Sequence, residues 1–160
     1  MKNKHIFLVC IIVASFVWTA SLVAMNYNQL PDQIPTHYGV SGDPDSWGSK
    51  TTLLIYPSLQ VAFLAISLVI YKYPNYANIP LTIGLKHLSK NLRERAYEIV
   101  RDVVFITMAI VTFLMLYLTR ETLEVAKGQA MSINLWGVLA FLIFLAPVIV
   151  YYSIKMRRLS

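Results

Sequence analysis

Apolar residues gather in four long runs that are separated by polar stretches. The runs cover about residues 6–25, 53–71, 103–118 and 133–154. A helix of about 20 residues crosses the hydrocarbon core of a bilayer, which is roughly 30 Å thick. The pattern therefore predicts an all-α integral membrane protein with four transmembrane helices in a single membrane domain over residues 1–160.

Three details refine these helices. The first run is longer than the apolar core of a signal peptide, and no small-residue cleavage motif ends it, so we expect it to remain as a helix. None of the runs contains Asp, Glu, Lys or Arg, which argues against a proton relay or a voltage sensor. Gln60 lies inside the second run, where a hydrogen bond between helices is favoured over a ligand contact.

The most polar stretch, residues 72–102, separates the second run from the third. From residue 85 it has an apolar stripe at helical spacing, formed by Leu85, Leu88, Leu92, Ala96, Ile99 and Val103. This pattern predicts an amphipathic helix at the membrane interface before the third span. If this helix is a connector that lies along the membrane surface, its basic face contacts lipid. That face contains Lys86, Lys90, Arg93 and Arg101. Docking of a cytoplasmic protein is the alternative.

Composition and charge support a membrane location and predict its orientation. The chain is 57% hydrophobic and 14% charged, whereas soluble domains average about 45–50% and 25%. All but three of the 14 Lys and Arg residues lie near the two ends of the chain or in the stretch 72–102; the exceptions are Lys50, Arg120 and Lys127. The positive-inside rule then places both termini in the cytoplasm and residues 26–52 outside. Because the net charge of +6 follows this topology, no nucleic-acid partner is implied.

The outer loop, residues 26–52, holds most of the candidate chemistry. Turn-forming dipeptides indicate that it is structured, and we expect its shape to depend on Pro31, Ile34, Pro35 and Gly42. The candidate ligand-binding residues are His37, Tyr38, Asp43, Asp45, Trp47 and Lys50. Each has a structural alternative as well, since acidic side chains fix turns and aromatic side chains anchor a loop at the headgroups.

Metal, cofactor and nucleophile motifs are not found in the sequence. The loop has one histidine, and no His-x-x-x-His or Cys-x-x-Cys pair occurs anywhere. There is no G-x-S-x-G elbow and no phosphate-binding glycine loop. We therefore expect no metal, no cofactor and no assigned catalytic residue.

The stretch LPDQIPTHYGVSGDPDSWGSK, residues 30–50, resembles the signature of a bacterial membrane domain of unknown function, number 1648. The matching positions are Pro31, Ile34, Pro35, His37, Tyr38, Gly42, Asp45, Trp47 and Lys50, and the later NIPL at 78–81 is also similar. The resemblance covers roughly the first two-thirds of the chain. This domain also forms the N-terminal part of immunity proteins against a sporulation-delaying toxin peptide. The resemblance implies a multipass protein of the bacterial plasma membrane and, in the immunity branch, protection from a peptide toxin coupled to capture of a repressor.

These observations favour a non-enzymatic membrane protein whose outer loop recognises an extracellular peptide or an envelope component. One alternative is a hydrolase-like membrane enzyme, with His37 as base and Asp43 or Asp45 as its partner. Another is a membrane scaffold that binds a cytoplasmic partner through the basic helix.

Overall fold

The computed structural model describes residues 1–76 and 89–159 and is mostly helical. The helices are α1 (Asn3–Asn26), α2 (Ile55–Lys72), α3 (Lys90–Ala126) and α4 (Trp136–Arg157). Two strands, β1 (Gln33–Tyr38) and β2 (Pro44–Ser49), form an antiparallel hairpin between α1 and α2. Short 3-10 helices, η1 (Tyr27–Gln29), η2 (Lys50–Leu54) and η3 (Pro74–Tyr76), follow α1, precede α2 and follow α2.

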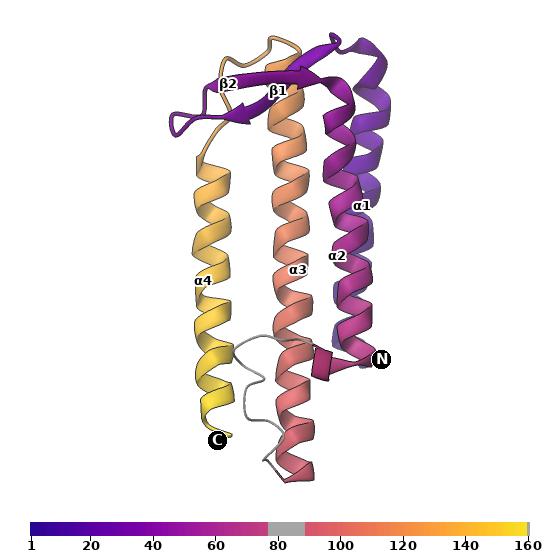
Figure 1. Ribbon diagram of the computed structural model, residues 1–160, viewed down its shortest axis with the longest axis vertical. Helices are drawn as coiled ribbons and strands as arrows, with labels where there is room; N and C mark the ends of the chain where they lie inside the picture. Colours follow the sequence, from indigo (N-terminus) through magenta and orange to yellow (C-terminus); the bar gives the residue numbers. More distant parts are fainter. Residues whose placement is uncertain (77–88, 160) are drawn as a thin grey trace.

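The helices run along the long axis of the molecule, and the hairpin lies across one end of them (Figure 1). Both chain termini lie toward the opposite end. Within the described residues, four helices are long and apolar enough to cross a membrane, which confirms the four predicted spans. The predicted helical fold class is confirmed in its main feature, but the chain is not all-α, because part of the loop forms the hairpin.

Helix α3 differs most from the prediction. It continues for 37 residues without a break and joins the later part of the expected interfacial helix, the third span and part of the following polar link. Three residues of the predicted apolar stripe are buried inside the bundle: Ala96, Ile99 and Val103 cluster with Tyr152 and Met156 of α4. Because α4 covers these apolar residues, they are buried by protein and not by the membrane surface. Leu85, Lys86, Leu88 and the NIPL motif lie outside the described residues.

Helix α3 is also the centre of the bundle, since it packs against α1, α2 and α4. One apolar cluster near the hairpin contains Val23, Leu30, Ile34, Leu53 and Leu123. A second cluster toward the termini joins Ile12 of α1 to Phe105 and Ala109 of α3. The α1–α2–α3 core therefore extends along the length of the bundle.

A polar contact lies between these two clusters. The fully buried Gln60 donates from Nε2 to Ser15 Oγ at 3.2 Å, to Thr19 Oγ1 at 3.1 Å and to the Thr112 carbonyl at 2.9 Å. The predicted inter-helix role of Gln60 is confirmed. The Gln60 amide links α2 to both α1 and α3. Inside a membrane no water is available to take the place of these hydrogen bonds.

Replacing Gln60 with Leu is expected to lower bundle stability by about 1 kcal/mol, the usual size of a polar contact between membrane helices. Thermal unfolding in mild detergent measures the change. Gln129→Leu is the matched control, because Gln129 is exposed after the end of α3. Equal melting temperatures for the two variants would show that the Gln60 contacts do not stabilise the bundle.

Candidate functional site

The hairpin is the framework of the predicted site. Across its strands Ile34 pairs with Gly48 and Pro35 with Trp47, and the register shifts around His37. In its turn the Gly39 amide donates to the Asp43 carbonyl at 2.9 Å. Proline has no backbone N–H to donate. It fits at position 35 because the sheet has two strands, so no third strand requires a hydrogen bond from this residue.

The inner side of the hairpin is firmly attached to the bundle. Ile34 and Pro35 are buried, and Ile34 belongs to the cluster with Val23 and Leu123. The hairpin turn contacts the α3–α4 loop, where the Ile133 amide donates to the Gly42 carbonyl at 2.9 Å. The hairpin is therefore attached at two separate places, to the helices through Ile34 and to the α3–α4 loop through Gly42.

Glycine is required at position 42 for two reasons. Its φ of +88° is unfavourable for residues with a Cβ, and a Cβ there would lie 2.5 Å from the Ile133 carbonyl oxygen. Ile34, Pro35 and Gly42 thus lie at the hairpin's attachment points. Pro31 is exposed, just before β1.

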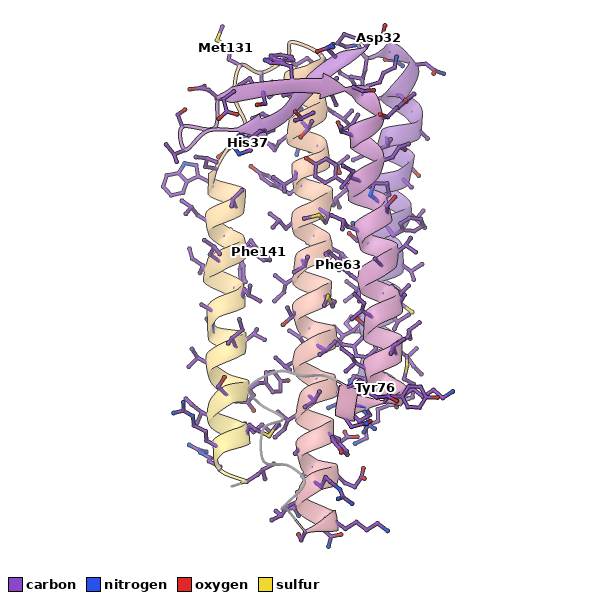
Figure 2. The ribbon with its side chains drawn as sticks, in the orientation of Figure 1. Asp32, His37, Phe63, Tyr76, Met131 and Phe141 are labelled. Carbon is purple, nitrogen blue, oxygen red and sulfur yellow. The ribbon has the colours of Figure 1, made fainter. Side chains whose placement is uncertain are left out.

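The structure brings two of the six candidate ligand-binding residues into contact. His37 Nδ1 lies 2.5 Å from Asp45 Oδ1, and the two side chains are 70% and 50% exposed. Trp47, on the same strand as Asp45, is 55% exposed. Figure 2 shows His37 on the hairpin, at the end of the bundle opposite Tyr76. The outer part of the hairpin therefore presents a large ring and an accessible histidine–aspartate pair.

Two of the other candidates, Asp43 and Lys50, have partners of their own, and Tyr38 is half-buried. Asp43 accepts from the Ser41 hydroxyl at 2.7 Å, a contact within the turn. The Lys50 amine lies 3.2 Å from an Asp32 carboxylate oxygen and 5.3 Å from the centre of the Tyr27 ring. The Tyr38 hydroxyl is buried, and burial raises the pKa of this phenol above its ordinary value. These three side chains take part in the structure of the hairpin and its base.

The basic surface predicted on the cytoplasmic helix is only partly described. Arg101 donates from Nε to the Tyr71 carbonyl at 3.0 Å and contacts Glu98 at 3.3 Å, so it joins α3 to α2. Lys90 and Arg93 lie on the first turn of α3. Lys86 falls outside the part of the chain that the structure describes.

Sequence reasoning missed a buried ionisable cluster at the terminal end of the bundle. His5 is fully buried, and its Nε2 lies 2.9 Å from Asp102 Oδ1. Lys4 contacts the same carboxylate at 2.5 Å. Rings of Tyr71 and Phe105 lie 5.4 and 5.2 Å from the His5 ring. The cluster joins α1 to α3 in apolar surroundings, where an unpaired charge is costly.

A helical projection of α1 contains the signal for this cluster. His5, Ile12, Ser15, Thr19 and Val23 follow one face at helical spacing, and all five are buried. The apolar run predicted from the sequence begins at residue 6, and the predicted cytoplasmic link includes Asp102. The sequence pattern therefore does not pair His5 with Asp102.

Among the residues that the structure describes, no three His, Cys, Asp or Glu side chains are grouped as a metal site would require. The geometry defines a class: a multipass helical membrane protein with a hairpin across one end of its helices. Residues 6–61 match the model of a family described as Domain of unknown function (DUF1648), which confirms the resemblance to that domain. The match covers most of α1, the hairpin and the start of α2, a shorter stretch than expected.

One curated relative is an uncharacterized protein from Archaeoglobus fulgidus. It is 37% identical over 78 residues, and the alignment covers 44% of this chain and 42% of the relative. The chain therefore matches less than half the length of that protein. No solved structure matches the chain.

Replacing Gly42 with Ala is expected to cost about 2–3 kcal/mol, because the added Cβ combines backbone strain with a clash at Ile133. Thermal unfolding and protease cleavage of the hairpin measure the effect. Gly128→Ala is the matched control: Gly128 also has a positive φ, +71°, but a Cβ there meets nothing within 4 Å. We expect this control to lose only about 1 kcal/mol. Equal losses would mean that the contact with Ile133 does not hold the hairpin.

Proposed function

We propose that this chain is a non-enzymatic membrane protein whose hairpin recognises a peptide or an envelope component at the outer face of the cell. The observation that carries the proposal is the division of the hairpin into an anchored side and a presented side. Ile34 and Gly42 attach it to the helices, while Trp47 and the His37–Asp45 pair are exposed. A rigid platform that presents an aromatic ring and polar groups is typical of a recognition surface.

A peptide is the ligand that this geometry favours. The sheet has two strands, so each has an edge without a strand partner in the sheet. An extended peptide can add to such an edge through backbone hydrogen bonds, while side chains such as Trp47 provide selectivity. β2 is the more accessible strand, since most of its residues are exposed. Protection against a toxic peptide, the function implied by the sequence resemblance, agrees with this mode of binding.

The orientation belongs to the same proposal: both termini face the cytoplasm and the hairpin faces outward. The distribution of Lys and Arg supports it. The fold is consistent with this orientation, because both termini lie at one end of the bundle and the hairpin lies at the opposite end (Figure 1). The resemblance implies that the membrane is the bacterial plasma membrane.

One observation favours a second candidate function, a membrane enzyme. In the His37–Asp45 contact, the carboxylate orients the imidazole as it does in acid–base catalysis. Ser46 is the cross-strand partner of His37 in the register. Hydrolysis of an envelope substrate that is lost in both His37→Gln and Asp45→Asn would support this candidate over simple recognition.

Cysteine labelling tests the orientation. In a Cys10→Ala background, Val40→Cys on the exposed hairpin turn is expected to react with a membrane-impermeant maleimide in intact cells. Glu94→Cys, near the start of α3, is expected to react only after the cells are permeabilised. The opposite labelling pattern would reverse the topology and remove the outward-facing hairpin from the proposal.

Survival assays test recognition by the hairpin. Cells with and without the protein are exposed to cationic peptides and to killing factors from related bacteria. Trp47→Ala and the double variant His37→Ala, Asp45→Ala are expected to lose protection, with apparent affinity falling by at least about tenfold, as for central interface residues.

Gln33→Ala, an exposed change on β1, is the control and should leave protection intact. Immunoblots of membrane fractions check that the variants insert equally. If correctly inserted hairpin variants protect as well as the unaltered protein, the hairpin is not the recognition site.

A further inference from the structure

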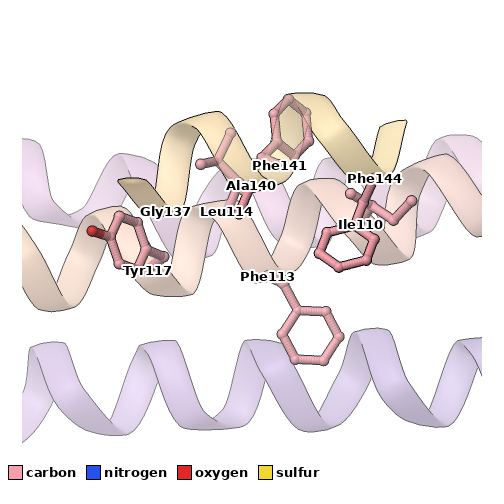
Figure 3. Close-up of a pocket in the computed structure, with 8 residues that line it drawn as sticks. All are labelled: Ile110, Phe113, Leu114, Tyr117, Gly137, Ala140, Phe141 and Phe144. Carbon is pink, nitrogen blue, oxygen red and sulfur yellow. The ribbon is translucent and has the colours of Figure 1, made fainter. Parts of the chain in front are cut away.

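Two apolar grooves lie side by side on α3, away from the hairpin surface. One, of about 400 Å³, lies between α3 and α4 and is lined by Ile110, Leu114, Ala140, Phe141 and Phe144. The other, of about 280 Å³, lies between α3 and α1 and includes Trp18, Leu22 and Leu116. Phe113 and Tyr117 line both grooves. Figure 3 shows Phe113 directed away from α4, so its ring forms a ridge between the two grooves.

The grooves approach each other near Tyr117, at the hairpin end of the bundle. A Cβ on Gly137 would collide with the Tyr117 ring, so α4 lies very close to α3 here. The Tyr117 hydroxyl donates to the Asn134 carbonyl, just before α4 begins. This contact closes the α3–α4 groove at its hairpin end, whereas the groove walls formed by Phe113 and Phe144 remain exposed.

A cation lies at this same end. Arg120 lines the α1–α3 groove one helical turn beyond Leu116, and its side chain is 69% exposed. Its Nε contacts Glu124 at 3.4 Å, a distance that indicates a weak surface ion pair. The guanidinium has further donors, and its planar shape suits bidentate binding of phosphate.

We propose that this face binds a diacyl phospholipid, with one acyl chain in each groove, Phe113 between the chains and the phosphate at Arg120. Two narrow grooves divided by an aromatic ridge fit two flexible chains better than a single helix, which needs one continuous groove. The apolar grooves lie on segments able to span a membrane, and Arg120 lies where those segments approach the polar hairpin end. This site is separate from the hairpin and does not depend on its proposed function.

Native mass spectrometry of the detergent-purified chain tests the site with three probes. Phosphatidylglycerol has two chains and a phosphate, diacylglycerol lacks the phosphate, and lysophosphatidylglycerol lacks one chain. We expect phosphatidylglycerol to bind about fivefold more tightly than diacylglycerol, as one favourable basic contact at the membrane surface implies. Lysophosphatidylglycerol is expected to bind more weakly than phosphatidylglycerol as well.

Two variants assign these preferences to residues. Ala140→Phe fills the α3–α4 groove and is expected to remove the advantage of the second chain. Arg120→Gln is expected to remove the advantage of the phosphate. Ala146→Phe at an exposed position of α4 and Lys127→Gln at the same end of the bundle are matched controls that should bind like the unaltered chain. Circular dichroism and gel filtration confirm that the variants are folded.

Equal binding of all three probes, or unchanged preferences in folded Ala140→Phe and Arg120→Gln, would overturn the proposal. So would a dimer that Ala140→Phe converts to a monomer while lipid binding stays constant, because a second copy would then occupy this face. Survival assays on the hairpin variants do not bear on these outcomes.

Discussion

The packing of α1, α2 and α4 around α3 is the constraint on which the rest of the structure depends. A membrane provides no aqueous partner for a polar group inside the bundle, so each such group has to be satisfied by a neighbouring helix. The Gln60 amide nitrogen and the Asp102 carboxylate meet this requirement at two levels of the bundle, whereas Gln60 Oε1 is buried without a hydrogen-bond partner. Both contacts involve α3. Its unbroken length therefore determines where α1 and α2 lie and, through them, where the hairpin rests.

The hairpin depends on the helices because it cannot be stable by itself. An isolated two-stranded sheet is marginal in water, and these strands contain Pro, Gly, Asp and Ser, which are poor strand formers. Burial of Ile34 and the contact of Gly42 with the α3–α4 loop supply what the strands lack. Because the anchoring residues point inward, Trp47 and His37 remain exposed without loosening the attachment.

The sequence predicted the features that follow from periodicity and composition. The four spans, the structured loop and the inter-helix role of Gln60 emerge from runs of apolar residues and a single polar interruption. The hairpin was not predicted, because Pro35 argues against a strand in a larger sheet and fits here because the sheet has two strands. The apolar stripe before the third span was predicted to lie at the membrane interface, because the charged face of residues 90–102 resembles an interfacial helix. Helix α4, which covers the stripe, is distant in sequence.

The candidate site was predictable only in composition. The loop sequence identified His37, Asp45 and Trp47 as available chemistry, yet pairing of the first two requires the register of the hairpin. The His5–Asp102 contact joins residues that are 97 positions apart, so no local pattern indicates it. Positions in one helix reveal a buried face, but the partner of that face is known only once the helices are assembled.

Helix α4 packs on α3 along one side only, and an apolar groove remains between the two helices. It packs mainly on α3, and most of its apolar side chains are exposed, as expected for a helix that faces lipid. At Gly137 the α4 backbone packs directly on the Tyr117 ring of α3, because glycine has no side chain to hold them apart. Farther along, the rings of Phe141 and Phe144 line the open groove on α3. Close packing at one end and bulky rings beyond it therefore produce the groove, and lipid chains are the apolar groups that a bilayer always supplies to fill it.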